Sequence, residues 1–193
     1  MEKKKSVFVI VGASGSGKST VLNRLMDIHP SKFGYSISHT TRKPRGEEKD
    51  GIHYHFITLE QFEKDEKDGK FLETATVHGN RYGTSFEAIN HVISENKICV
   101  LDLNIDGALS VKKTDYNSLM ILVKPPSFEV LEKRLRDRGT ETEDLIQIRL
   151  ETARKEDGLF QKHKDIFDYT LINDDLDKAV AELEKFVKDF FNF

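Results

Sequence analysis

The chain has 193 residues, of which 37% are hydrophobic and 33% charged, and its formal net charge is -3. It can form one well-cored domain, and the near balance of charge excludes a general attraction to nucleic acid or to a membrane surface. The chain has a single cysteine, Cys99, so a disulfide within the chain is excluded. Cys99 lies in an apolar run, which is typical of a buried thiol in a reducing compartment. The basic N-terminus leads into only five apolar residues, 7–11, too few for a secretory signal, so we expect a cytoplasmic protein.

Short apolar strands and amphipathic helices alternate along most of the chain. Residues 7–11 are uniformly apolar, as in a strand buried on both faces of a parallel sheet, and apolar residues at helical spacing follow up to Pro30. Further strands are expected at 98–103, 119–123 and 169–172, with helices at 108–111, after Pro125-Pro126 and at 176–190. This alternation favours an α/β fold with a parallel sheet.

Two segments interrupt the alternation. Residues 35–96 contain "GIHYHFITLEQF" and "KFLETATVHGNRYG", which read as half-polar strands with glycine turns, so we expect a small β-rich lobe inserted there. Residues 134–158 are highly charged with only a thin apolar stripe. Both a mobile helical flap and a solvated surface helix fit this second segment.

The turn after the first strand, "GASGSGKS" at 12–19, fits the phosphate-binding P-loop pattern in full. Its glycines let the backbone turn tightly with N–H groups pointing inward, and the following helix adds the positive end of its dipole. Lys18 supplies a charge between the β- and γ-phosphates, and the Ser19 hydroxyl can ligate Mg²⁺. A plain connecting loop is the alternative, but the strand before and the helix after favour a nucleoside-triphosphate site.

The P-loop does not by itself name the class of protein. A GTPase would usually carry an Asn-Lys-x-Asp motif, and the nearest string, Asn173-Asp174-Asp175, lacks the lysine. At 193 residues we do not expect a motor ATPase either. These exclusions leave a small-molecule kinase as the best-supported class.

The segment "YSISHTTRKPRGEEKDGIHYHF" predicts a second anion site. Arg42 and Arg45 form a guanidinium pair suited to a phosphate, and Tyr54 offers a further hydroxyl. For two arginines alone, a solvated basic loop is the simpler interpretation. The same lobe adds an acceptor carboxylate at Glu73 and hydroxyls nearby, and this combination favours a ligand site.

The strings "GASGSGKST", "SHTTRKPR", "GNRYGT", "KPPS", "RGTETE" and "INDDLDKA" occur in the order seen in guanylate kinases, and the resemblance spans residues 6–190. It implies ATP-dependent phosphorylation of GMP to GDP in purine nucleotide metabolism. It also implies a P-loop α/β fold whose three-layer parallel-sheet core comprises 1–34, 97–133 and 159–193. The GMP-binding lobe would be 35–96 and the helical lid 134–158.

The resemblance assigns site residues by motif position. The ATP site would comprise Gly12, Ala13, Ser14, Gly15, Ser16, Gly17, Lys18, Ser19, Thr20, Arg134, Asn173 and Asp174. The GMP site would comprise Ser38, Arg42, Arg45, Tyr54, Glu73, Tyr82, Thr84, Asp102 and Asn104. Catalytic roles would fall to Lys18, Arg42, Arg138 and Arg149. Mg²⁺, entering with the co-substrate ATP, would be held by Ser19 and, through water, by Asp102.

The chemistry of guanine supports the carboxylate at Glu73. A carboxylate accepts from N1–H and the exocyclic amine together, a donor pattern that adenine lacks, so such a site should reject AMP. Two positions depart from the family pattern: Asn104 stands where aspartate is usual, and Asp106 where glutamine is usual. An asparagine carbonyl still accepts from the exocyclic amine but without charge assistance, so we expect a weaker guanine preference.

Two alternatives remain at this point. A guanylate-kinase-like module that binds a partner peptide would typically lose the P-loop lysine or the lid arginines, which this chain keeps. A kinase for another nucleoside monophosphate is disfavoured by Glu73. We expect ATP and GMP as partners, with dGMP as a further candidate, no nucleic acid or membrane partner, and a monomer or homodimer.

Overall fold

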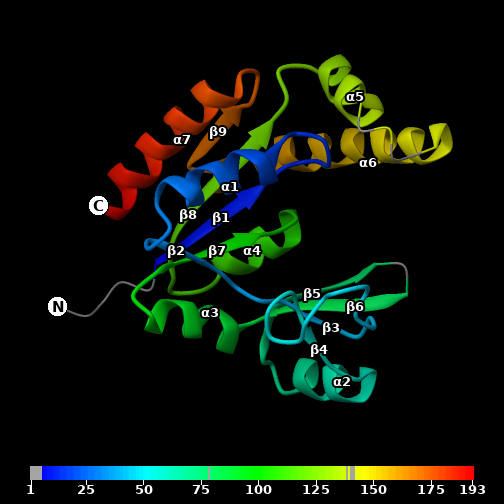
Figure 1. The fold of residues 1–193 in the computed structure, drawn as a ribbon, viewed down its shortest axis with the longest axis vertical. Coiled ribbons are helices and arrows are strands. Elements are labelled where there is room, and N and C mark those ends of the chain that lie inside the picture. The colour runs from blue at the N-terminus through cyan, green and yellow to red at the C-terminus, as the bar shows by residue number, and fades with distance from the viewer. Residues whose placement is uncertain (1–5, 78, 138, 140–141) are drawn as a thin grey trace.

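The computed structural model describes residues 6–77, 79–137, 139 and 142–193, and a parallel sheet forms the centre of this part of the chain (Figure 1). The sheet has five strands in the order β2-β7-β1-β8-β9. Their bounds are β1 (Ser6–Val11), β2 (Phe33–Tyr35), β7 (Ile98–Asp102), β8 (Asn117–Lys124) and β9 (Tyr169–Ile172). The predicted α/β fold with a parallel sheet is confirmed.

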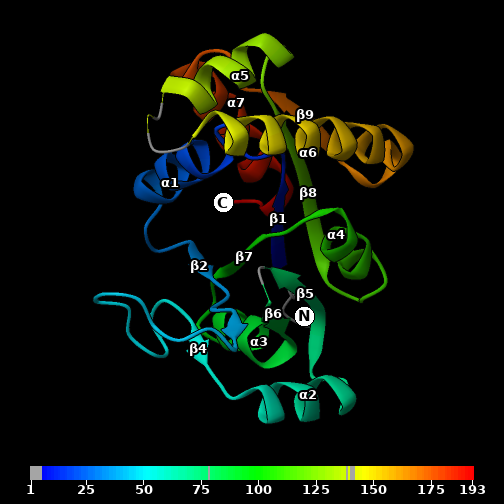
Figure 2. The same cartoon turned by 90° about the vertical axis from the view of Figure 1, so that its right-hand side faces the viewer.

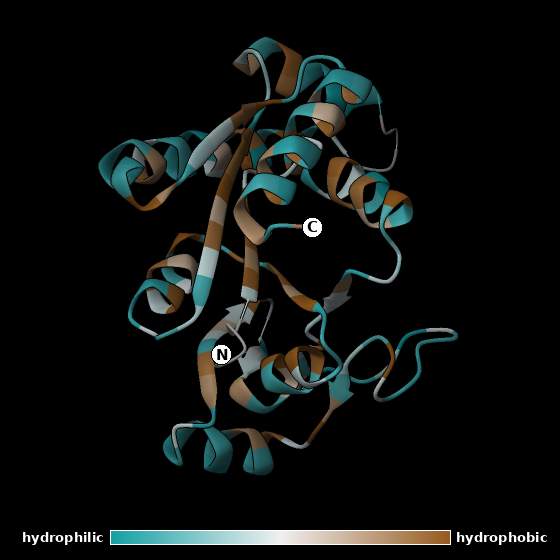
Figure 3. Cartoon of the chain, turned by 90° about the vertical axis from the view of Figure 1, so that its left-hand side faces the viewer, coloured by the Kyte–Doolittle hydropathy of each residue, from teal (hydrophilic) through white to brown (hydrophobic). Residues whose placement is uncertain are grey.

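Helices cover both faces of this sheet. One face is covered by α1 (Lys18–Ile28) and α7 (Leu176–Phe191), the other by α3 (Phe86–Ser94) and α4 (Ile105–Lys112). Successive side chains of β1 point to opposite faces, so Phe8 and Ile10 pack with α1 and α7 while Val7 and Val9 pack with α3 and α4. Figure 3 shows the apolar character of these central strands. The result is the expected three-layer core.

The core also contains the single cysteine. Cys99 is fully buried on β7, and burial raises the pKa of its thiol to about 12. A thiol with so high a pKa stays protonated and unreactive. The expectation of a core cysteine is confirmed.

A second, smaller sheet lies within residues 35–96. Its strand order is β4-β3-β6-β5, with β3 (His39–Thr40), β4 (His55–Phe56), β5 (Phe71–Val77) and β6 (Asn80–Ser85). The strand prediction was wrong for residues 59–62, which belong to helix α2 (Leu59–Lys67). The Thr58 side chain caps this helix by accepting from the Gln61 N–H. Helix α3 was not expected either; its side chains Ile89 and Val92 are buried against the main sheet.

The charged segment 134–158, for which a flap and a surface helix were both considered, includes the end of one helix and most of another. These are α5 (Phe128–Asp137) and α6 (Glu143–Lys162), and a short 3₁₀ helix, η1 (Lys164–Ile166), follows them. Figure 2 shows α5 and α6 at one end of the molecule and the small sheet with α2 at the other. The main sheet, with the predicted P-loop after β1, lies between these two groups of elements. In the part of the chain that the structure describes, no helix combines the length and apolar character that a membrane span needs.

Candidate active site

The P-loop joins the end of β1 to the start of α1. Gly15 and Gly17 have φ angles of 90° and 85°, a left-handed conformation that favours glycine. At Gly12 the constraint is space, since a Cβ there would lie 2.5 Å from the Val123 carbonyl oxygen. The loop bounds a cavity of about 400 Å³, lined by Gly12, Ala13, Ser14, Gly15, Gly17, Lys18, Ser19, Thr20, Asp102, Leu103, Asn104 and Glu156. Most of the residues expected at the ATP phosphates therefore surround one cavity.

Two further residues fix the P-loop from outside. Asn173, which is only 5% exposed, donates from Nδ2 to the Ser16 carbonyl oxygen at 2.9 Å. Arg134 on α5 donates in turn to the Asn173 carbonyl oxygen at 2.8 Å. A second cavity, of about 390 Å³, is lined by Gly15, Gly17, Thr20, Arg134, Asp137, Asn173, Asp174 and Leu176. The structure thus places Arg134, Asn173 and Asp174 beside the P-loop, as expected for an ATP site.

Lys18 faces two carboxylates in the P-loop cavity. It forms an ion pair with Asp102 at the end of β7, and Glu156 on α6 lines the same cavity. Burial raises the pKa of Glu156, and the charge of Lys18 opposes that rise. Sequence reasoning missed Glu156, although it stands seven residues after Arg149 and so on the same face of α6. Arg149 itself donates to the Ser14 hydroxyl at 3.0 Å, which brings that face of α6 onto the P-loop.

The cavity also offers oxygen ligands for a metal ion. The Ser19 hydroxyl and the carboxylates of Asp102 and Glu156 all line it. Within the described residues there is no group of three or more His, Cys, Asp or Glu side chains that could hold a metal by themselves. A Mg²⁺ ion keeps several waters and takes phosphate oxygens as ligands, so it needs only a few oxygen ligands from the protein. The residues present therefore fit Mg²⁺.

A further cavity, of about 430 Å³, opens on the other side of Asp102. It is lined by Tyr35, Ser36, Ile37, Ser38, Ile52, His53, Tyr54, Thr84, Val100, Leu101, Asp102 and Leu103. Asp102 and Leu103 line both this cavity and the P-loop cavity. The two cavities adjoin at the carboxyl end of β7, where α/β folds commonly bind ligands.

Glu73 lies beside the first turn of α4. Its carboxylate accepts a hydrogen bond of 2.7 Å from the Thr84 hydroxyl, and a Cβ on Gly107 would come 3.3 Å from its Cγ. The Asn104 Oδ1 accepts from the Gly107 N–H at 2.9 Å and caps α4. One lone pair of the Asn104 Oδ1 therefore serves the helix, and its second lone pair and the amide hydrogens are left to meet a ligand.

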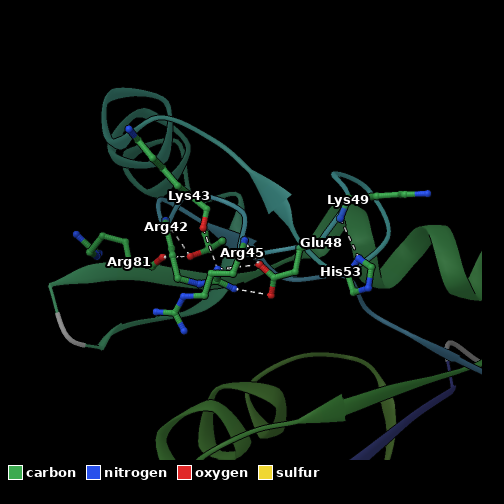
Figure 4. A network of polar contacts seen from close by, with 8 residues as sticks. Arg42, Lys43, Arg45, Glu48, Lys49, His53 and Arg81 are labelled. Carbon is green, nitrogen blue, oxygen red and sulfur yellow. Dashed lines mark hydrogen bonds and ion pairs between the residues drawn. The ribbon is translucent and has the colours of Figure 1, made fainter.

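Arg42 lies at the centre of a polar network on the small lobe (Figure 4). It is 9% exposed, and its guanidinium is paired with Glu48 through Nη1 to Oε2 at 2.8 Å and Nη2 to Oε1 at 2.9 Å. Its Cζ lies 5.3 Å from the centroid of the Tyr54 ring. Glu48 and Tyr82 both form hydrogen bonds that raise the pKa of Arg42. The structure thus brings Arg42, Tyr54 and Tyr82 together, with Arg45 on the same loop.

Sequence reasoning also missed Glu48. Hydrogen bonds from the Arg42 side chain and the Arg45 backbone lower the pKa of Glu48 to about 2. Its position in the hydrophilic string "GEEKDG" resembles an ordinary exposed turn, so the sequence carries no signal for it. Arg138, a predicted catalytic residue, lies outside the described residues.

A parallel sheet whose first strand runs through a glycine-rich loop into a helix defines the chain as a P-loop α/β protein. Comparison with known families identifies the particular kind. The family model for guanylate kinase matches residues 4–190, and the chain belongs to the guanylate kinase family.

Individual relatives agree with this assignment. Guanylate kinase 1 of Oryza sativa subsp. japonica is 53% identical over 92% of this chain, and the guanylate kinase of Homo sapiens is 47% identical over 92%. The chain covers 89% of the human protein but only 46% of the rice protein, so it spans about half the length of that plant relative. The crystal structure of guanylate kinase from Anaplasma phagocytophilum matches with a TM-score of 0.63 and 26% identity, over 95% of this chain and 85% of that one.

Proposed function

We propose that the chain transfers the γ-phosphoryl group of ATP to GMP, giving ADP and GDP. The observation that carries the proposal is the pair of adjoining cavities that share Asp102 and Leu103 as a common wall. One cavity has the P-loop of a nucleoside-triphosphate site, and the other opens toward the small lobe. Phosphoryl transfer requires such an arrangement, because donor and acceptor must meet with their reacting atoms in line.

The donor half would be built around the P-loop. Backbone N–H groups of residues 12–19 and the start of α1 would bind the ATP phosphates, and Lys18 would move from Asp102 to the β- and γ-phosphates. Arg134, Asn173 and Asp174 would border the nucleoside end of ATP in the second cavity. Bound between Ser19 and water on Asp102, Mg²⁺ would supply neutralisation of phosphate charge.

The acceptor half would use the small lobe, and we retain 35–96 as a GMP-binding lobe and 134–158 as a lid within this proposal. Arg42, Arg45, Tyr54 and Tyr82 would hold the GMP phosphate. Glu73, supported by Thr84, would accept from N1–H and the amine of guanine, with Ser38 nearby. The second lone pair of the Asn104 Oδ1 would accept from the exocyclic amine of guanine.

The transfer itself asks for alignment and charge neutralisation rather than covalent chemistry by the protein. An oxygen of the GMP phosphate attacks the γ-phosphorus, and the bond from that phosphorus to the β–γ bridging oxygen breaks, which leaves ADP. Lys18 and Arg149 would stabilise charge on the transferring group, and Arg138 is proposed for the same role by its motif position. Docking α6 on the P-loop would also exclude water.

A coupled ADP-release assay tests the proposal. Mg·ATP is supplied with GMP, dGMP, AMP, CMP or UMP, and the controls omit the acceptor or add excess EDTA. We expect the highest kcat/KM with GMP and no turnover in EDTA. Absence of turnover with every acceptor would contradict the proposal and favour a peptide-binding module instead.

A further inference from the structure

The Arg42 guanidinium has two edges that can bind an anion, and protein groups occupy only one of them fully. A guanidinium carries five N–H donors and can bind an anion in bidentate fashion through its end edge, Nη1 and Nη2, or its side edge, Nε and Nη2. Nη1 donates to Glu48 Oε2 and to the Lys43 carbonyl oxygen, each at 2.8 Å, while Nη2 donates to Glu48 Oε1. The end edge is therefore filled by protein groups.

The side edge of Arg42 is the part of the guanidinium that the contacts with Glu48 and Lys43 leave over. After the contacts with Glu48 and Lys43, the donors that remain on Arg42 are Nε–H and the second hydrogen of Nη2. Tyr82 contributes to the raised pKa of Arg42, and the Tyr82 ring centroid lies 6.0 Å from that of Tyr54. Two aromatic rings also restrain the guanidinium, because its Cζ lies 5.3 Å from the Tyr54 ring centroid and 5.8 Å from that of Phe56. The guanidinium therefore lies beside the aromatic pair of Tyr54 and Tyr82, with a side edge that Glu48 and Lys43 do not occupy.

The same carboxylate fixes the backbone of the next arginine. Glu48 Oε2 accepts from the Arg45 N–H at 2.7 Å, and the Glu48 N–H donates to the Arg45 carbonyl oxygen at 3.0 Å (Figure 4). These reciprocal bonds close a turn in which Gly46 has a φ of 53°. Glu48 thus restrains both arginines of the loop at once.

We infer that Glu48 is a positioning residue for the phosphate of the acceptor nucleotide. It occupies the end edge of Arg42 so that the side edge, with Tyr54 and Tyr82, forms a prearranged phosphate cradle, and it holds the turn that carries Arg45. The inference rests on the proposed function, since it deepens the role of the acceptor site. The Glu48 carboxylate stays charged at physiological pH, because the hydrogen bonds from Arg42 and Arg45 lower its pKa to about 2.

An opposite role would make Glu48 a competitor that mimics phosphate and must leave Arg42 when GMP arrives. The geometry favours positioning over competition. Leaving would break three hydrogen bonds on one carboxylate, including the one that restrains the Arg45 N–H. The two roles predict opposite effects of removing the charge.

Calorimetric binding of GMP and of guanosine separates the phosphate site from the base site. We compare the wild-type chain with Glu48→Gln, which keeps the shape but loses the charge and one acceptor oxygen. The matched control is Glu47→Gln, which removes the same charge from the exposed neighbour on the same loop. Glu48→Gln is expected to weaken GMP binding about tenfold or more while guanosine binding changes less than about twofold. Glu48→Asp keeps the charge on a shorter side chain, so its affinity for GMP should lie between those of the wild type and of Glu48→Gln.

Kinetics give a second readout. The KM for GMP should rise in Glu48→Gln while the KM for ATP stays unchanged, and circular dichroism should show that the variant is folded. Equal loss of GMP and guanosine binding, tighter GMP binding, or no change would each overturn the inference. If the wild-type chain itself binds GMP no more tightly than guanosine, the proposed acceptor site fails instead.

Discussion

The Asn173 side chain lies directly against the backbone of the P-loop at Gly17. Its Nδ2 donates to the neighbouring Ser16 carbonyl oxygen at 2.9 Å, and a Cβ built on Gly17 would come 2.1 Å from that same nitrogen. The loop after β9 and the loop after β1 therefore approach too closely for any side chain at residue 17. This contact ties the C-terminal part of the sheet to the phosphate-binding loop.

Gly17→Ala should destabilise the protein strongly. The left-handed φ of 85° costs about 1–2 kcal/mol for a residue with a Cβ, and the collision with Asn173 adds about 1–3 kcal/mol. The matched control is Gly69→Ala, because Gly69 has a φ of 71° but open space around its Cβ position. Urea denaturation should show a clearly larger loss for Gly17→Ala, and equal losses would contradict the role of the Asn173 contact.

Lys18→Ala should abolish most turnover while leaving acceptor binding intact. Removing a preorganised charge from the transferring phosphoryl group typically costs about 10²–10³ in kcat. GMP affinity should change less than about twofold, because Lys18 lines the P-loop cavity and not the acceptor cavity. Coupled ADP release and calorimetry measure the two effects, with the exposed Lys178→Ala as control. Normal turnover in Lys18→Ala would exclude the P-loop from the reaction.

The sequence predicted what is encoded by neighbouring residues. The P-loop, the central strands and Asp102 at the end of β7 follow from local patterns, since a phosphate cradle needs glycines and a lysine at fixed spacing. Strand β2 was not predicted, because it has only three residues with Gly34 in the middle. Its place at the sheet edge comes from pairing with β7, which no local pattern records.

The residues that were missed depend on contacts between separate segments. Glu156 joins the candidate site because Arg149 and Ala153 bring α6 against the P-loop. Asn104 was expected to accept from guanine, and the structure shows its Oδ1 accepting from the Gly107 N–H as the cap of α4. The residue type of Glu156 was visible in the sequence, while its place in the P-loop cavity depends on the packing of α6.

Glu73→Gln should narrow the discrimination between GMP and AMP. The carboxylate offers two acceptor oxygens to guanine, whereas the amide offers one acceptor and an NH₂ group that meets the donors of guanine unfavourably. We expect the ratio of kcat/KM for GMP to kcat/KM for AMP to fall about a hundredfold, chiefly because kcat/KM for GMP falls. Glu63→Gln on the exposed side of α2 is the control. An unchanged ratio in Glu73→Gln would mean that guanine is read by other residues.

Glu156→Gln should change how stability depends on pH. Burial raises the pKa of Glu156 above 4.5, so the folded protein binds this proton more tightly than the unfolded chain. The resulting stabilisation is complete below pH 4.5 and is lost as the pH rises through the raised pKa. From pH 4 to 7 the free energy of unfolding of the wild type should therefore fall relative to the variant. The change should stay under about 1 kcal/mol, since solvent screens a half-buried group.

Glu151→Gln on the same helix gives a control of opposite sign. The hydrogen bond from Lys155 lowers the pKa of Glu151, so its contribution is present above pH 4.5 and is lost as the pH falls through the lowered pKa. Over the acid end of the range, the wild type should gain stability relative to Glu151→Gln as the pH rises. Urea denaturation at several pH values measures both trends. Parallel trends for the two variants would show that Glu156 does not lie in a desolvated position beside the P-loop.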